Sequence, residues 1–189
     1  MKTTERQTMM RRLLLVVISV LALAYSGFAT GTRVVLVGVM SDSMCGLKHS
    51  TASPEAAKCV IGCVAKGADY VLVSGGKIYK FEKKDDFYEY VAGKNVQVVG
   101  SLTGDTFARM DLGVEEITGA VPTNVHLYEG ILKVAGGKYT LESEGKVYKI
   151  DPSTAEDKGE GLPPMAGRRV ELVGMPEGDT IHMRGAQTR

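Results

Sequence analysis

Large aromatic side chains are scarce in this chain. Its 189 residues include no tryptophan and only four phenylalanines, whereas glycine occurs 23 times. Such a composition suits a helical bundle poorly, because glycine weakens helices and a bundle core needs large apolar side chains. The composition instead favours short strands joined by many tight turns.

A strong charge of either sign is also missing. The 23 basic and 22 acidic residues give a formal net charge of +1, and removal of residues 1–29 would leave 19 basic and 21 acidic residues, a net charge of −2. Proteins that bind nucleic acid usually present a strongly basic face, and binders of single strands add exposed aromatic side chains on which bases stack. We therefore expect no nucleic-acid partner.

Familiar catalytic motifs are missing too. The sequence contains no Ser/His/Asp motif, no glycine-rich phosphate loop and no telling pair of carboxylates. It also lacks the C-x-x-C-H motif of haem attachment and the C-x-x-C motif of thiol–disulfide oxidoreductases. We therefore expect a protein that is not an enzyme and has no catalytic residues.

The N-terminal segment has the pattern of a secretory signal peptide. Four basic residues precede the apolar run LLLVVISVLALA, and the small residues of YSGFATG follow it. The apolar run is shorter than the roughly 20 residues that a spanning helix needs. Cleavage after Ala29 would give a periplasmic or secreted protein. Alternatively, an uncleaved segment 1–29 would anchor the protein in the inner membrane, facing the periplasm, and only then would the membrane be a partner.

The remainder of the chain contains an internal repeat. YVLVSGGKIYKF (70–81) aligns without gaps to YTLESEGKVYKI (139–150), with seven of twelve positions identical. AGKNVQVVGSLTGDT (92–106) aligns with AGRRVELVGMPEGDT (166–180), with eight of fifteen positions identical. A repeat of this kind indicates two copies of one structural unit.

Each copy predicts five short strands. Two alternating runs around a glycine-containing turn predict a β-hairpin, in which Tyr70 and Leu72 of the first copy and Tyr139 and Leu141 of the second face inward. The longest connector lies between the third and fourth strands, which is typical of an OB-type Greek-key barrel. In the first copy this connector could form a short helix, whereas prolines disfavour one in the second.

We therefore predict a mainly β protein with two tandem OB-like barrel modules. The first spans residues 34–112 and the second residues 125–185, with a linker over residues 113–124. The alternative is a single sandwich in which both copies share one core.

The two copies differ most between the first strand and the hairpin. Gly130 and Gly137 of the second copy are separated by six residues, whereas the matching Gly38 and Gly67 are separated by 28. All three cysteines of the chain lie in this insert, residues 41–67. Since the second copy has no cysteine, we infer that the fold does not need cysteines as staples.

The insert contains the signals of a short helix. Ser53 is a typical N-cap, Pro54 a typical first residue, and Glu55 a favourable residue in the first turn. Gly67 is a typical residue just beyond the end. We predict a helix over residues 54–66.

This helix would place Cys59 and Cys63 one turn apart on one face, with Cβ atoms about 5–6 Å apart. A disulfide needs Cβ atoms about 3.5–4.5 Å apart, so the two are poor disulfide partners but well placed to bind one metal ion. Cys45 and His49, in the loop before the helix, supply two more candidate ligands. Together they form a Cys3His set, which is typical of structural zinc.

Several alternatives to zinc remain open for the insert, among them three reduced thiols or an intermolecular disulfide. Cys45 could form a disulfide with Cys59 or Cys63, which would leave one free thiol. Copper(I) could bind the thiolates together with Met40 and Met44, although these methionines are more simply interpreted as apolar filling beside a strand end.

The sequence resembles a recurrent class of small exported bacterial proteins of unknown function. The shared pattern is S-D-x-x-C-G-x-x-H, a C-x3-C helix, G-x-x-Y-V-L, G-K-x-Y, and V-x-V-x-G before G-D-T, and it covers residues 35–112. The resemblance implies an exported, non-catalytic β domain without a known substrate, and the second copy matches only its strands. Asp42 belongs to the shared pattern; it could orient His49 from outside the ligand set or simply cap a turn.

The repeated K-x-Y-K motif is the best candidate for a further binding surface. Its residues are Lys77, Tyr79, Lys80, Lys146, Tyr148 and Lys149. We favour the simpler interpretation, in which the tyrosines face inward and the lysines face water.

The sequence thus predicts an exported, non-catalytic protein that binds a metal ion, zinc first and copper second, with a structural or accessory role in the cell envelope. The alternative is a membrane-anchored accessory subunit of an envelope complex, whose insert is closed by a disulfide. In both cases an envelope protein is the expected kind of partner.

Overall fold

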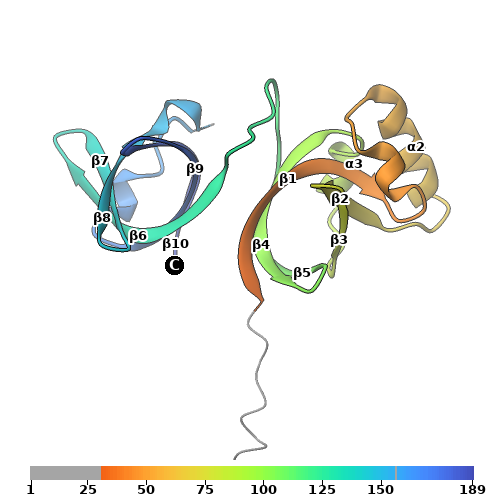
Figure 1. Ribbon diagram of the computed structural model, residues 1–189, viewed down its shortest axis with the longest axis horizontal. Coiled ribbons are helices and arrows are strands. Elements are labelled where there is room, and N and C mark those ends of the chain that lie inside the picture. Colours follow the sequence, from red (N-terminus) through yellow and green to blue (C-terminus); the bar gives the residue numbers. More distant parts are fainter. Residues whose placement is uncertain (1–30, 156) are drawn as a thin grey trace, which may run out of the picture. The chain divides into compact units, whose positions relative to one another are not determined.

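The structure, a computed structural model, describes residues 31–155 and 157–189. Two closed five-stranded barrels follow one another along the chain (Figure 1), which confirms the predicted pair of OB-like modules. The expected signal segment, residues 1–29, lies outside the described residues. Within the described ranges, no helix has both the length and the apolar character needed to cross a membrane.

The first barrel closes in the order β1-β2-β3-β5-β4. Its strands are β1 (Thr32–Asp42), β2 (Tyr70–Ser74), β3 (Lys77–Phe81), β4 (Asn95–Thr103) and β5 (Thr106–Glu116). Neighbouring strands are antiparallel, except that β3 and β5 run parallel. Because β5 continues to Glu116, it includes the first residues of the segment expected as a linker.

The second barrel repeats this topology as β6-β7-β8-β10-β9. Its strands are β6 (His126–Ala135), β7 (Lys138–Ser143), β8 (Lys146–Asp151), β9 (Arg169–Glu177) and β10 (Thr180–Thr188). Here too one pair, β8 with β10, is parallel and the others are antiparallel.

Each barrel encloses its own apolar core, so the alternative of one shared sandwich core is wrong. The inward-facing Leu72 and Leu141 are fully buried at matching places in the two hairpins. Tyr70 and Tyr139 are partly buried and pack against these cores, as the alternation of the hairpin sequence predicts.

The connectors between the third and fourth strands differ as predicted. In the first barrel the connector forms the one-turn helix α3 (Phe87–Tyr90), and Tyr88 is buried in the core. In the second barrel the described part of the connector forms two 3-10 turns, Pro152–Thr154 and Pro163–Met165, each starting at a proline. Leu162 fills the core there and is 1% exposed.

The insert of the first barrel forms a 3-10 turn, η1 (Gly46–His49), and the helix α2 (Pro54–Val64). The side chain of Ser53 accepts a hydrogen bond of 3.0 Å from the backbone N–H of Ala56, which confirms the predicted N-cap. The helix ends at Val64, two residues earlier than predicted, and its inner residue Val60 is fully buried.

The insert is fixed to the barrel through the turn before β4. The carbonyl of Gly93 accepts a hydrogen bond from the N–H of Ser53, and the N–H of Gly93 donates to the carbonyl of Met40. A Cβ atom at Gly93 would lie 2.2 Å from the backbone nitrogen of Ala57, so only glycine permits this close approach of helix and turn. α2 is therefore positioned by backbone contacts at its first turn.

Candidate metal centre

The three cysteines of the chain lie together in the structure. Cys59 and Cys63 come from successive turns of α2, and Cys45 comes from the loop just before η1. The Sγ atom of Cys45 is 3.8 Å from that of Cys59 and 3.8 Å from that of Cys63. All three sulfur atoms lie within 4.8 Å of one another, and none of the cysteines forms a disulfide.

These distances suit coordination of one ion. A tetrahedral ion with metal–sulfur bonds of about 2.3 Å holds its sulfur ligands about 3.8 Å apart. Sulfur atoms joined in a disulfide are only about 2.0 Å apart. The cysteines are therefore arranged as a group that could hold a metal ion, and the alternative of an insert closed by a disulfide is not the form that the structure shows.

The loop that carries Cys45 is shaped by Asp42. The Oδ1 atom of Asp42 accepts hydrogen bonds from the backbone N–H groups of Met44, at 2.9 Å, and Cys45, at 2.8 Å. The hydroxyl of Ser41 donates to the carbonyl of Gly46 at 2.9 Å, on the other side of the turn. Asp42 thus caps a turn, one of the two roles suggested by the sequence, and this turn holds Cys45 next to α2.

His49 lies in a second group of candidate ligands. Ligand atoms of Asp42, Cys45 and His49 lie within 4.8 Å of one another, and this group shares Cys45 with the three-cysteine group. Among the described residues, no group of this kind combines His49 with all three sulfur atoms. A single tetrahedral Cys3His site therefore stays a prediction.

Two polar atoms in the second group are buried without a hydrogen-bond partner. They are the Nε2 atom of His49 and the Oδ2 atom of Asp42, and the Asp42 residue as a whole is 0% exposed. Buried polar atoms are normally paired, because loss of water without a replacement partner is costly. Asp42 and His49 both belong to a group that could hold a metal ion, and a bound cation would give such atoms a partner.

Two thiols of the three-cysteine group, those of Cys45 and Cys63, have raised pKa values when no cation is present. Burial, the hydrogen bond with Cys45 and the negative charge of Asp42 raise the pKa of Cys63 to about 12. The pKa of Cys45 is also raised, chiefly by its hydrogen bond with Cys59 and then by burial. A metal ion binds thiolates, so it must displace these protons.

The two methionines near the cluster occupy opposite environments. Met40 is fully buried in the core of the first barrel, which agrees with its interpretation as apolar filling, whereas Met44 is 64% exposed. The Met40 side chain packs in the barrel core.

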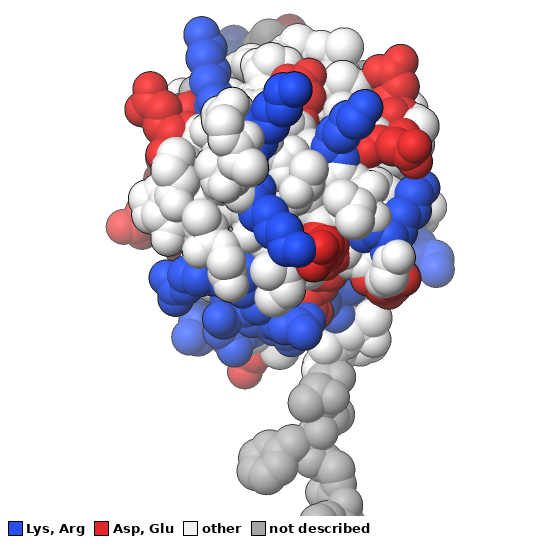
Figure 2. Space-filling view, turned by 90° about the vertical axis from the view of Figure 1, so that its left-hand side faces the viewer, with Lys and Arg blue, Asp and Glu red and all other residues white. Residues whose placement is uncertain are grey.

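The K-x-Y-K motifs lie in β3 and β8. Tyr79 and Tyr148 pack against the cores of their barrels. Lys80 forms an ion pair with Asp105, and Lys146, which matches Lys77 in the repeat, forms an ion pair with Asp179. Figure 2 shows one face of the molecule, on which basic and acidic side chains are interspersed over much of the surface.

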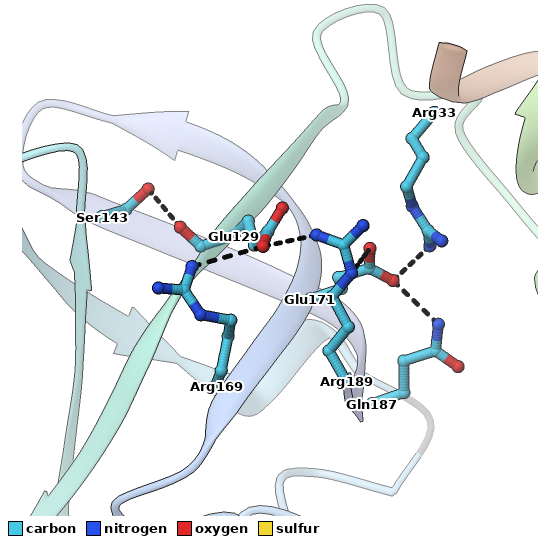
Figure 3. Close-up of polar contacts among 7 residues, drawn as sticks. All are labelled: Arg33, Glu129, Ser143, Arg169, Glu171, Gln187 and Arg189. Carbon is cyan, nitrogen blue, oxygen red and sulfur yellow. Dashed lines mark hydrogen bonds and ion pairs between the residues drawn. The ribbon is translucent and has the colours of Figure 1, made fainter. Parts of the chain in front are cut away.

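The sequence analysis missed a buried carboxylate in β9. Glu171 is 1% exposed and accepts a hydrogen bond of 2.9 Å from the side-chain amide of Gln187 (Figure 3). Its ion pairs are formed with Arg33 and Arg189. These cationic and amide partners offset the cost of burying the negative charge of Glu171.

An equivalent polar position exists in β4. Gln97 is 3% exposed, donates to Glu115 at 3.1 Å and accepts from Arg184 at 2.9 Å. The only sequence signal for both positions was the polar second residue of V-Q-V-V-G and V-E-L-V-G, inside an otherwise apolar strand. One partner of each residue follows from strand pairing: β4 with β5 places Gln97 opposite Glu115, and β9 with β10 places Glu171 opposite Gln187.

A third polar feature is His182 in β10, between two carboxylates. Its Nδ1 atom is 2.9 Å from Asp151 and its Nε2 atom is 2.8 Å from Glu177. The hydrogen bond with Glu177 is the largest of the causes that raise the pKa of His182. The other histidine of this barrel, His126, forms a hydrogen bond with the side chain of Asn124 and lies next to the ring of Tyr128.

The centre in the insert is therefore the feature of the described residues that most resembles a ligand site. Comparison with models of known protein families, with curated proteins and with solved structures finds no match, so the function must be argued from the geometry of this centre.

Proposed function

We propose that this chain is an exported, non-catalytic protein that binds zinc through Cys45, Cys59 and Cys63 and has a structural or accessory role in the cell envelope. The observation that carries the proposal is the spacing of the thiols. Cys45 lies 3.8 Å from each of the two helical sulfur atoms, which is the spacing that a tetrahedral zinc ion imposes on its sulfur ligands.

Zinc is preferred to copper because of the neighbouring donors. Copper(I) favours thiolates and thioethers, but the thioether of Met40 is buried in the barrel core and Met44 is largely exposed. The donors that lie next to Cys45 are instead the carboxylate of Asp42 and the imidazole of His49. Oxygen and nitrogen donors beside thiolates suit zinc, so copper is the second choice.

The position of the centre supports a structural role for the ion. The three thiols join the loop before η1 to α2, two parts of the insert whose other ties to the barrel are mainly backbone contacts and apolar packing. An ion bound by all three would therefore lock the loop to the helix. Two observations support a location in the envelope. The N-terminal sequence has the pattern of a secretory signal peptide, and the first copy resembles exported proteins.

Elemental analysis of the purified protein, with titration of its thiols, tests this proposal. We expect at least one zinc ion per chain, and loss of that ion in both Cys59→Ser and Cys63→Ser. His126→Ala is the control, because this histidine lies in the second barrel and we expect its loss to leave the zinc content unchanged. A reduced, folded protein that binds neither zinc nor copper would contradict the proposal.

A further inference from the structure

We infer that the insert binds two metal ions and that the thiolate of Cys45 bridges them. The first ion is the one proposed above, bound by Cys45, Cys59 and Cys63, so the inference rests on the proposed function. The second ion is bound by Asp42, Cys45 and His49.

The ligand atoms are arranged as two groups that meet at Cys45. The structure contains two groups of three donors, and within each group every ligand atom lies within 4.8 Å of the other two. The groups share Cys45 and no other residue. A thiolate has more than one lone pair, so the sulfur of Cys45 can be a ligand of both ions, which a nitrogen of His49 cannot be.

Asp42 and His49 each have a buried polar atom without a hydrogen-bond partner. The Oδ1 atom of Asp42 is satisfied by two backbone N–H groups, but its Oδ2 atom is buried and has no hydrogen-bond partner. The Nε2 atom of His49 is in the same situation. Both residues belong to the second group, and a divalent cation bound there would give these atoms a partner.

The charge of the cluster also favours a second ion. Once the first ion has displaced the thiol protons, three thiolates and the carboxylate of Asp42 bring four negative charges into a small volume, and Asp42 is fully buried. One divalent ion would leave two of these charges uncompensated, whereas two divalent ions neutralise the cluster. A metal-bound imidazole, which would come from His49, adds a ligand without adding charge.

The chemistry of the two donor sets indicates zinc for both positions. Three sulfur ligands hold the first ion, and one oxygen, one sulfur and one nitrogen ligand hold the second, all of which are common zinc ligands. Each ion then has three protein ligands, and water supplies the fourth.

Zinc titration of the reduced, metal-free chain tests the inference, with a chromophoric chelator as competitor and circular dichroism as a check of folding. We expect two zinc ions per chain. Asp42→Asn and His49→Ala should each bind one ion, and so should the double variant Cys59→Ser/Cys63→Ser. Cys45→Ser should lose high-affinity binding at both positions, since it removes the shared ligand.

Asp42→Asn is the variant that protects the test against misfolding. An asparagine can still accept the two backbone hydrogen bonds that shape the loop, but its neutral amide is a poor zinc ligand. Cobalt substitution gives a second readout: the His49→Ala protein should keep the intense sulfur-to-cobalt absorption of a three-thiolate site. His126→Ala should bind two ions and is the control for removal of a histidine.

The outcomes separate this inference from the proposed function. One ion per chain at saturation, lost both in His49→Ala and in Cys59→Ser, would establish a single Cys3His site; it would overturn the inference and keep the proposed function. Two ions per chain that both persist in His49→Ala and in Asp42→Asn would also overturn it. Absence of any bound ion in the reduced wild-type chain would overturn both.

Discussion

The two barrels have the same topology, but the outer faces of their hairpins are built from different residues. In the second barrel this face is open to solvent: Lys133 pairs with Glu142, and Val147 is 55% exposed. In the first barrel Ser41 matches Lys133 and Val73 matches Glu142, and both are buried, at 0% and 4% exposure. Small and apolar residues thus replace the charged pair where the insert lies.

This difference shows that the barrel itself is adapted to the insert. η1 packs against β1, β2 and β3, and α2 packs against β1, so the insert covers a face that the second barrel leaves to water. The hydroxyl of Ser41 even hydrogen-bonds to Gly46 within the insert. A loop that carried cysteines without packing would need none of these changes. The candidate metal centre therefore lies over a face of the barrel whose small and apolar residues are buried by the insert.

Exchanging the charged and apolar residues between the two hairpin faces should change stability more than any other substitution discussed below. Val73→Glu would place a carboxylate in a buried position without a cation, and we expect the free energy of unfolding of the first barrel to fall by about 3–5 kcal/mol. Glu142→Val removes only an exposed ion pair, so we expect a change below about 1 kcal/mol. Urea unfolding of each variant measures the difference. Similar losses in the two variants would show that the insert does not cover Val73.

Substitution of the matching glycines before β4 and β9 should give a smaller difference in stability between the two barrels. Gly93 and Gly167 both have positive φ, +68° and +75°, so an alanine costs about 1–2 kcal/mol at either position. A Cβ atom at Gly93 also meets the backbone of Ala57 at 2.2 Å, whereas a Cβ atom at Gly167 has no neighbour within 4 Å. Gly93→Ala should therefore cost roughly 2 kcal/mol more than Gly167→Ala.

Zinc affinity gives a second measurement that should distinguish Gly93→Ala from Gly167→Ala. Displacement of α2 would move Cys59 and Cys63 away from Cys45, so we expect weaker zinc binding in Gly93→Ala and unchanged binding in Gly167→Ala. Equal stability and equal zinc affinity of the two variants would show that the first turn of α2 does not depend on its contact with Gly93.

The comparison of the copies also explains which features could be predicted from the sequence. The repeat aligns the hairpins and the closing strands, so the five-stranded layout follows from local patterns of alternation and turns. The N-cap at Ser53 is equally local, and the structure confirms it. Such features are determined by residues that lie close together in the sequence, so the sequence alone predicts them.

The ligand set could not be predicted to the same extent, because it depends on how a loop lies against a helix. The C-x3-C spacing places Cys59 and Cys63 on one face, but the position of Cys45 depends on the turn capped by Asp42. The spacing of His49 from Cys45 says nothing of its distance from the sulfur atoms of α2. The partners of Glu171 were missed for the same reason, because they come from distant parts of the chain.

The smallest effect that we expect is a difference between the two barrels in how their stability depends on pH. His182 in the second barrel is matched in the first by Ala108, which cannot titrate. The pKa of His182 is raised by the hydrogen bonds to Glu177 and Asp151, so its contribution to stability is fully present below the unfolded value of about 6.5. It is lost as the pH rises through the raised folded value.

Because Glu177 is largely exposed, we expect this contribution to be less than about 1 kcal/mol. Urea unfolding at a series of pH values from 5.5 to 8.5, compared between the wild type and His182→Gln, isolates it, since glutamine keeps a polar side chain without the titration. The wild type should lose stability relative to the variant as the pH rises. A difference in free energy of unfolding that stays constant across this range would show that the two carboxylates do not hold the proton on His182. The charged and apolar hairpin faces would then be the only electrostatic distinction between the barrels that these tests support.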